Sequence, residues 1–210
     1  KPENGVYLRD GVIYIAEQGK DRALMDAKDI RIPGAHNVYN VMMAAAIVQG
    51  LCQDDDIVEV AKTFGGVEHR IEFVREFEGV KYYNDSIASS PTRTIAGLES
   101  FDQKLILIAG GYDKHIPYDV LGVPICRHVK TLLLTGATAP KIRACVEQAD
   151  CPEKPEIIDV PDLAAAVRCA NAVAQPGDIV IMSPASASFD CFKNFMERGN
   201  LFKELVHKLV

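Results

Sequence analysis

The sequence predicts an α/β protein with a Rossmann-like, mostly parallel, doubly wound sheet, preceded by a hairpin and two helices. From about residue 68 onward, short apolar segments alternate with segments of helical periodicity, which is typical of βαβ units. The segments "LILIA" and "TLLL" are apolar at every position. Continuous apolar runs of this length indicate parallel strands that are buried on both faces.

Residues 1 to 67 predict a hairpin, a loop and two helices. "GVYLRDGVIYIA" contains two alternating runs joined by Asp10-Gly11, which favours a tight hairpin turn. The first helix is expected through "HNVYNVMMAAAIVQGL" and the second through "DDDIVEVAKTF". The three aspartates lie at the N-terminus of the second helix, where the helix dipole stabilises negative charge. We therefore interpret them as a cap and not as a metal site. Gly65-Gly66 ends that helix and marks a domain boundary.

Residues 68 to 210 predict two strands around Glu78-Gly79, followed by alternating strands and helices. The expected parallel strands are "KLILIAGG", "VKTLLLTG", "PEIIDVP" and "DIVIMSPA", and the expected helices are "PTRTIAGLESF", "PYDVLGVPICRHV", "APKIRACVEQA", "DLAAAVRCANAVA" and "DCFKNFMERGNLFKELVHKL".

Composition excludes several classes of protein. The 210 residues carry a net charge of -6, whereas nucleic-acid binders have basic faces. No apolar run reaches the roughly 18 residues that a membrane span needs.

The six cysteines form no CxxC motif, so we expect buried free thiols and a reducing, cytoplasmic setting. The chain starts at Lys1 instead of a methionine, which suggests a piece of a longer protein.

Polar residues follow four of the expected strands, in "NDSIASSPT", "GGYDKH", "TGATAP" and "SPASASFD". Each stretch alone can be explained by turns and helix caps, such as Ser90-Pro91. Together they line the carboxyl edge of one sheet, where helix N-termini converge and suit a carboxylate or phosphate. Lys114 adds a cation that capping does not require. We therefore predict a site for an anionic ligand at this edge.

Several nucleotide and catalytic motifs are absent from the chain. No GxGxxG follows a strand, so the sequence does not support a dinucleotide-binding fold. No GxxxxGK[ST] motif of a P-loop occurs, and no GxSxG motif of an α/β-hydrolase nucleophile elbow occurs. The five histidines show no spacing typical of metal ligands. We expect no metal ligand within this chain.

Three motifs occur in a fixed order: "GAHNVYN", then "VEHRIEF" followed by "YYNDSIASSPT", then "SPASASFDCFKNFMERGNLF". In this combination the chain resembles the Mur ligase family, and the last motif is similar to that of its D-glutamate-adding branch. The resemblance implies that residues 1–67 are the C-terminal part of the central ATPase domain. Residues 68–210 would be the C-terminal Rossmann-like domain. The P-loop and the metal ligands would lie upstream, so no catalytic residue is expected here and the chain alone should be inactive.

The resemblance implies an ATP-binding set of Asn37, Asn40, Arg70 and Asp85. Amides can pair with the edge of adenine, arginine suits phosphate and a carboxylate suits ribose hydroxyls. Two structural alternatives stay open: Asn37 could serve only as a helix cap, and Arg70 and Asp85 could form an ion pair.

The resemblance also implies a D-glutamate-binding set of Lys114, Ser188, Ser89, Phe189 and Phe195. A cation and hydroxyls suit the two carboxylates of this amino acid. For Phe195, core packing is the favoured alternative, because it lies on the apolar stripe of the last helix.

Two positions depart from the commoner family pattern "NDSKAT". Here Ile87 and Ser89 stand in place of the lysine and the threonine. Ser89 keeps a hydroxyl, whereas Ile87 removes a charge. Arg93, further along the next helix, could supply that charge, which is a hypothesis.

The activity implied is an ATP- and Mg2+-dependent ligation in peptidoglycan biosynthesis. ATP would phosphorylate the carboxylate of UDP-N-acetylmuramoyl-L-alanine, and the amine of D-glutamate would attack the acyl phosphate. We expect a monomer with small-molecule substrates and no nucleic-acid or membrane partner. Two alternatives are a sister ligase of the folylpolyglutamate synthase type and a stand-alone Rossmann-like anion-binding module. An upstream P-loop would favour a ligase.

Overall fold

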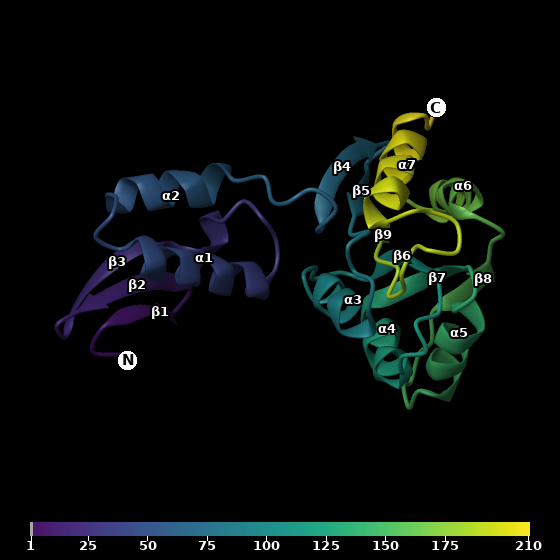
Figure 1. Cartoon of the computed structure of the whole chain (residues 1–210), viewed down its shortest axis with the longest axis horizontal. Helices are drawn as coiled ribbons and strands as arrows, with labels where there is room; N and C mark the ends of the chain where they lie inside the picture. The colour runs from purple at the N-terminus through teal and green to yellow at the C-terminus, as the bar shows by residue number, and fades with distance from the viewer. Residues whose placement is uncertain (1) are drawn as a thin grey trace. The chain divides into compact units, whose positions relative to one another are not determined.

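The computed structural model describes residues 2–210, which form two compact units (Figure 1). The first unit extends to Gly66 and the second runs from Val67 to Val210. The sequence predicted a boundary after residue 67. No helix among the described residues is long and apolar enough to cross a membrane.

A three-stranded antiparallel sheet forms one layer of the first unit. It consists of β1 (Gly5–Arg9), β2 (Val12–Glu17) and β3 (Lys20–Asp26) in that order. The hairpin predicted at Asp10-Gly11 is confirmed as β1–β2. The sequence analysis missed β3, where a loop was expected. Only Met25 is fully buried in that strand, so the apolar alternation that marks a half-buried strand is weak there.

The two predicted helices of the first unit are confirmed as α1 (Ala35–Val48) and α2 (Asp54–Thr63), preceded by a short 3-10 turn η1 (Ala27–Asp29). The Asp56 carboxylate accepts a hydrogen bond from the Gln53 backbone N–H at 2.9 Å. Arg22 Nε pairs with Asp54 Oδ2 at 2.7 Å. These contacts fit the interpretation of the acidic run as a helix cap.

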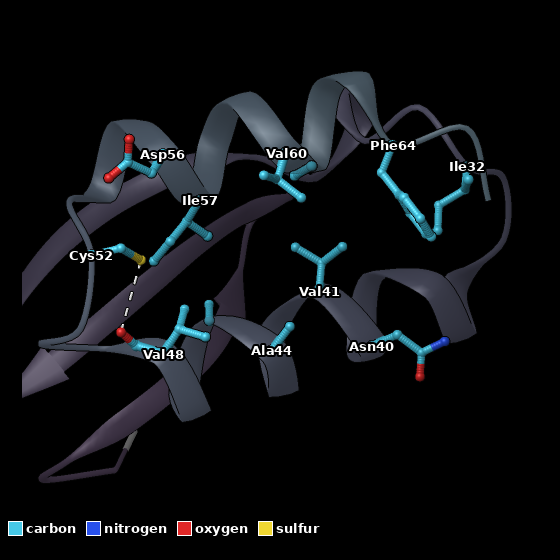
Figure 2. Close-up of a pocket in the computed structure, with 12 residues that line it drawn as sticks. Ile32, Asn40, Val41, Ala44, Val48, Cys52, Asp56, Ile57, Val60 and Phe64 are labelled. Atoms are coloured by element: carbon cyan, nitrogen blue, oxygen red, sulfur yellow. Dashed lines mark hydrogen bonds between the residues drawn. The ribbon is translucent and has the colours of Figure 1, made fainter. Parts of the chain in front are cut away.

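An open apolar groove separates α1 and α2 (Figure 2). Its volume is about 570 Å³, and side chains of both helices point into it. The labelled walls are Val41, Ala44 and Val48 on α1, Ile57 and Val60 on α2, and Ile32 and Phe64 at one end.

Helix α1 also exposes a second apolar stripe. Tyr39, Met43 and Ile47 follow one another at intervals of four residues, and 63%, 64% and 68% of their surfaces are exposed. The helix is therefore apolar around most of its circumference, a composition normally found in helices that are covered on every side.

The second unit is built on a six-stranded sheet of order β4-β5-β9-β6-β7-β8. β4 pairs antiparallel with β5, and every other pairing is parallel. This sheet confirms the predicted mostly parallel, doubly wound fold. The strands are β4 (Glu72–Phe77), β5 (Val80–Asn84), β6 (Leu105–Gly110), β7 (Val129–Thr135), β8 (Glu156–Asp159) and β9 (Ile179–Met182).

Helices cover both faces of this sheet (Figure 1). One face packs against α3 (Pro91–Leu98), α4 (Gly122–His128, after the 3-10 turn η2, Asp119–Leu121) and α5 (Ala139–Gln148). The other face packs against α6 (Leu163–Val173) and α7 (Phe195–His207). In β6, Leu105 and Leu107 belong to the first core, whereas Ile106 and Ile108 belong to the second. Burial on both faces explains why "LILIA" is apolar at every position.

Two expectations for this unit are wrong. The last helix starts at Phe195 and not near Asp190, because the Asn194 side chain accepts a hydrogen bond from the Glu197 N–H at 2.9 Å and so caps the helix there. The cysteines are not all buried free thiols. Cys126 and Cys151 form a disulfide between α4 and the segment after α5, and Cys52 and Cys191 are exposed.

Candidate functional site

A crevice of about 330 Å³ lies at the carboxyl edge of the second unit's sheet, with Gly110, Gly136, Asp190 and Arg198 among the residues that line it. β6 and β9 are neighbours, but the helices that follow them, α4 and α7, pack on opposite faces. The loops after these two strands must therefore diverge. In open α/β sheets such a switch point is the usual place for a ligand.

The loop after β9, residues 183–188, is buried along its whole length. Pro184 O accepts a hydrogen bond from Gly110 N–H at 2.8 Å. The Ser186 hydroxyl lies 2.8 Å from Thr138 Oγ1 and 3.0 Å from the Tyr118 hydroxyl. The loop is therefore fixed to the ends of β6 and to α5.

This loop brings part of the predicted D-glutamate set together. Ala187 O accepts from Tyr112 N–H at 3.0 Å, which places Ser188 beside the loop that carries Lys114. The Phe189 ring contacts the Tyr112 ring, with 6.0 Å between centroids. Ser188 is buried, whereas Lys114 and Phe189 are exposed.

Gly110 and Gly111 are required by packing. A Cβ at Gly110 would lie 1.9 Å from Thr135 O, and one at Gly111 would lie 2.4 Å from Ala187 O. Both residues also have positive φ angles of 110° and 145°, which favour glycine. The close approach of neighbouring backbones accounts for this pair without a ligand.

Asp85, at the end of β5, is only 3% exposed. Its Oδ1 accepts from Ile71 N–H at 3.3 Å, and its Oδ2 lies 2.7 Å from the Ser183 hydroxyl. Burial raises the pKa of Asp85 to about 7, although these hydrogen bonds and the charges of Arg70 and Arg93 oppose the rise. The Arg70–Asp85 ion pair left open by the sequence is not among those that residues 2–210 form.

A chain of hydrogen bonds joins Asp85 to α3. The Ser183 hydroxyl donates to Asp85 Oδ2 at 2.7 Å and lies 3.0 Å from Thr94 Oγ1, and the Thr94 hydroxyl donates to Ser183 O at 3.2 Å. Asp85 thus connects the end of β5 to the loop after β9 and to α3.

Arg198 of α7 is an organising residue that the sequence analysis did not select. It is 4% exposed, and its guanidinium donates to Ser86 Oγ, Ser86 O, Ser186 O and Ala187 O at 2.9 to 3.0 Å. Burial lowers its pKa to about 10, so it is charged at neutral pH. One side chain thus holds the residues next to Asp85 and Ser188. The only sequence signal was the "RG" pair inside the last motif.

Gly199 brings α7 close to the start of β4. A Cβ at this position would lie 2.3 Å from His69 Nδ1. His69 is buried, which lowers its pKa, and its Nδ1 lies 2.9 Å from Asn84 Nδ2. The neighbouring Arg70 has an exposed side chain. The close packing of Gly199 against His69 holds the backbone next to Arg70 in place.

Phe195 and Ser89 lie on the β5 side of the edge. The Phe195 backbone oxygen accepts from Ser86 Oγ at 2.7 Å, and its ring packs edge-on against His69. Phe195 is half-buried and outside both apolar cores, so the favoured alternative of core packing is wrong. Ser89 is half-buried in the loop between β5 and α3.

The two predicted asparagines lie together in the first unit. Asn37 donates from Nδ2 to Pro33 O at 2.6 Å, and its Oδ1 accepts from Asn40 Nδ2 at 3.1 Å. The N-cap of α1 is Gly34, so Asn37 is not the capping residue. Asn40 also lines one end of the apolar groove (Figure 2).

Among residues 2–210, the one group of acidic and histidine side chains close enough to share a metal ion is Glu68, His69 and Glu72. The Lys203 ammonium already pairs with both carboxylates, reaching Glu72 Oε1 at 3.1 Å. Because both carboxylates are already paired with a cation, the group does not fit a divalent-ion site.

The second unit is thus a Rossmann-like α/β domain with a crevice at its carboxyl edge. Residues 69–186 match the family model described as "Mur ligase, glutamate ligase domain". The chain belongs to the Mur ligase family.

Relatives named UDP-N-acetylmuramoylalanine–D-glutamate ligase match nearly the whole chain. The one from Acetivibrio thermocellus is 53% identical over 99% of this chain and 45% of its own length. The one from Clostridium acetobutylicum is 49% identical over 100% of the chain and 45% of its own length. The chain therefore spans less than half the length of these relatives.

Solved structures share the fold at low identity. UDP-N-acetylmuramate-alanine ligase from Thermotoga maritima matches 96% of this chain and 45% of its own, with a TM-score of 0.63 and 15% identity. Folylpolyglutamate synthase from Mycobacterium tuberculosis matches 95% of this chain and 46% of its own, with a TM-score of 0.61 and 15% identity.

Protonation of Asp85 should make the stability of the chain depend on pH. A carboxyl whose pKa is about 7 in the folded state and about 3.9 when unfolded stabilises the fold fully below pH 4. That contribution is lost as pH rises to about 7, and it amounts to roughly 4 kcal/mol at most. We expect Asp85→Asn to flatten the fall in unfolding free energy between pH 4 and 7, as measured by urea denaturation. Asp102→Asn, a change at an exposed residue of the same unit, should leave the pH-dependent fall in unfolding free energy unchanged. An equal fall in both variants would contradict the assignment of this pH dependence to Asp85.

Proposed function

We propose that this chain is the C-terminal part of a cytoplasmic, monomeric ATP-dependent ligase that joins D-glutamate to UDP-N-acetylmuramoyl-L-alanine in peptidoglycan biosynthesis. The observation that carries the proposal is the 53% identity, over 99% of the chain, to a relative named for this ligation. The carboxyl edge of the second unit supports it, because it carries the exposed cations Arg70 and Lys114, the buried Ser188 and the half-buried Ser89.

We infer that the first unit completes a central ATPase domain whose remainder lies upstream. Two features support this inference: α1 is apolar around most of its circumference, and an open groove lies between α1 and α2 (Figure 2). Relatives of more than twice the length have residues available to cover both surfaces. The second unit would be the C-terminal, amino-acid-binding domain.

On the second unit, Arg70 and Asp85 would bind the nucleotide. Arg70 is exposed and can place forked donors on phosphate. Asp85 is buried and already hydrogen-bonded. A hydrogen bond to ribose would therefore require its loop to open slightly.

D-glutamate would be held beside the loop after β9. The Lys114 ammonium would pair with one carboxylate, while the hydroxyls of Ser188 and Ser89 would donate to the other. Phe189 and Phe195 would flank the apolar part of the side chain. Ser188 is fixed by the hydrogen bonds of the buried loop, which suits a residue that orients a substrate.

Family members of this kind use ATP with Mg2+, which would supply charge neutralisation at the phosphates. The carboxylates of Glu68 and Glu72 are paired with Lys203, so this chain offers no suitable metal ligands there and no step is assigned to the ion. The work of this chain is to bind and orient the amine donor and to exclude water from the acyl phosphate.

A sister ligase that extends folates is less well supported. The folylpolyglutamate synthase structures are 15% identical to this chain, which indicates a shared fold, whereas the D-glutamate ligases are about 50% identical.

Ligation assays test the proposed function directly. We expect full-length protein, with the upstream coding sequence included, to form the amide product from ATP, UDP-N-acetylmuramoyl-L-alanine and D-glutamate. The chain of residues 1–210 should form none, because it has no P-loop. Product detected by mass spectrometry with the short chain, or with folate instead of the UDP-sugar substrate, would contradict the proposal.

Lys114 provides a test of the amino-acid subsite. In full-length protein, Lys114→Ala should raise the KM for D-glutamate by about 10- to 100-fold, since one charge-assisted hydrogen bond is worth about 1.5–3 kcal/mol. The KM for ATP should change less than threefold. Lys154→Ala, an exposed lysine near β8, is the control. A larger effect on ATP than on D-glutamate would mean that the subsites are assigned wrongly.

Met43 tests whether the exposed stripe of α1 is covered by the upstream part. Met43→Glu should change the melting temperature of the 210-residue chain by less than about 2 °C, because 64% of this residue is exposed there. In full-length protein it should be strongly destabilising, since it would bury a charge. Glu59→Gln, an exposed change on α2, serves as control in both proteins. Equal effects of Met43→Glu in the two lengths would contradict the domain proposal.

A further inference from the structure

We propose that Arg198 is a positioning residue of the amino-acid subsite, which controls the use of D-glutamate by holding Ser188 and Phe195 in place. The inference rests on the proposed function and adds to it a residue outside the predicted site. It is carried by the hydrogen bonds of one buried guanidinium group, which reach both segments of the chain that supply these two side chains.

One part of the guanidinium group holds the loop after β9. Nη2 of Arg198 donates to Ser186 O and Nη1 donates to Ala187 O, both at 3.0 Å. The two carbonyl groups directly before Ser188 are therefore bound by one rigid fork. Ala187 O also accepts a hydrogen bond from Tyr112 N–H at 3.0 Å. The backbone that leads into Ser188 is thus fixed by donors from two different elements.

This loop needs a restraint because one of its residues has an unfavourable backbone conformation. Ala185 is fully buried and has a φ angle of 56°, in the left-handed region that residues with a Cβ rarely adopt. Such a conformation persists only when the surrounding structure over-determines it. Arg198 bonds to the next two residues, Ser186 and Ala187, and so opposes relaxation of the loop.

The other part of the guanidinium group holds the start of α7 through Ser86. Nε of Arg198 donates to Ser86 Oγ at 3.0 Å, and Nη2 donates to Ser86 O at 2.9 Å. Ser86 Oγ in turn donates to Phe195 O at 2.7 Å. One bridging hydroxyl therefore connects Phe195 to the same guanidinium group that holds the loop before Ser188.

The predicted nucleotide residue beside Ser86 depends less on Arg198. The Asp85 carboxyl group accepts hydrogen bonds of its own from Ile71 N–H at 3.3 Å and from the Ser183 hydroxyl at 2.7 Å. Loss of Arg198 should therefore displace the amino-acid subsite more than Asp85. This asymmetry distinguishes a positioning role from a general effect on folding, which would impair the use of both substrates.

The geometry requires an arginine and not merely a cation. The planar guanidinium group of Arg198 donates to three residues in two separate segments, Ser86 on one side and Ser186 with Ala187 on the other. Lysine ends in a single ammonium group, so it keeps the charge but cannot hold both segments in the same way. Arg198→Lys thus tests the bridge separately from the charge, whereas Arg198→Met removes both.

The kinetic experiment uses full-length protein. Arg198→Lys should lower kcat/KM for D-glutamate by about 10-fold and Arg198→Met by about 100-fold, since a misplacement of about 1 Å can cost on the order of 100-fold in rate. The KM for ATP should change less than about threefold in both variants, because Asp85 keeps its own hydrogen bonds.

Lys203→Met is the control on the same helix. It removes the ion pairs of α7 with Glu68 and Glu72 but leaves the hydrogen bonds of Arg198 in place. It should lower the melting temperature of the full-length protein without changing kcat/KM for D-glutamate.

A second measurement, hydrogen exchange, does not depend on ligation. Tyr112 N–H donates to Ala187 O, and Phe192 N–H donates to Ser188 O at 2.8 Å, so exchange of these amides reports the position of the loop. In full-length protein, mass spectrometry should find faster exchange in the peptides containing Tyr112 and Phe192 for Arg198→Lys. The same peptides should be unchanged in Lys203→Met.

Equal losses for ATP and D-glutamate in the Arg198 variants would overturn the proposal, as would equal acceleration of exchange in Lys203→Met. If Arg198→Met does not fold, Arg198→Lys decides alone, and an unchanged kcat/KM for D-glutamate in that variant would reject the positioning role. A full-length protein that ligates nothing before any substitution would instead reject the proposed function. In that case the exchange measurement still shows whether Arg198 holds the loop.

Discussion

The guanidinium of Arg198 is the interaction on which the carboxyl edge of the second unit depends. It is 4% exposed and carries its charge among neutral oxygens of Ser86, Ser186 and Ala187. A buried charge is tolerated only when hydrogen bonds replace its hydration, so the two loops must keep the positions that supply those oxygens. The requirement fixes the end of β5 to the end of β9 through α7. Asp85 and Ser188 each lie next to a bonded residue, and their positions follow from the same constraint.

Close packing reinforces this arrangement at α7 and at the end of β6. Gly199 lets the helix approach His69, while Gly110 and Gly111 let the end of β6 approach Thr135 and Ala187. The side chains of Lys114, Phe189 and Arg93 differ from these packed residues because they are exposed. A closely packed base that carries exposed charged groups is suited to binding small anionic substrates in a defined orientation.

Sequence reasoning predicted what depends on local pattern and failed where distant contacts decide. The apolar runs "LILIA" and "TLLL" revealed buried parallel strands because burial on both faces leaves a continuous signal. β3 was missed because only Met25 of its residues is fully buried. The start of α7 was misplaced because the Asn194 cap, and not periodicity, sets it. Arg198 and His69 carried no signal of burial, since each finds its hydrogen-bond partners more than ten residues away. Likewise, the residue types made an Arg70–Asp85 ion pair plausible. In the structure the Asp85 carboxyl group instead accepts hydrogen bonds from Ile71 N–H and the Ser183 hydroxyl.

The burial of Asp85 connects packing to pH. Its oxygens accept from Ile71 N–H and from the Ser183 hydroxyl, and Ser183 in turn contacts Thr94 of α3. Burial raises the pKa of Asp85 to about 7 although these hydrogen bonds oppose the rise, so the lost hydration of the carboxylate outweighs what the donors restore. One carboxyl group therefore joins β5, β9 and α3, and the strength of that junction depends on pH up to about neutrality.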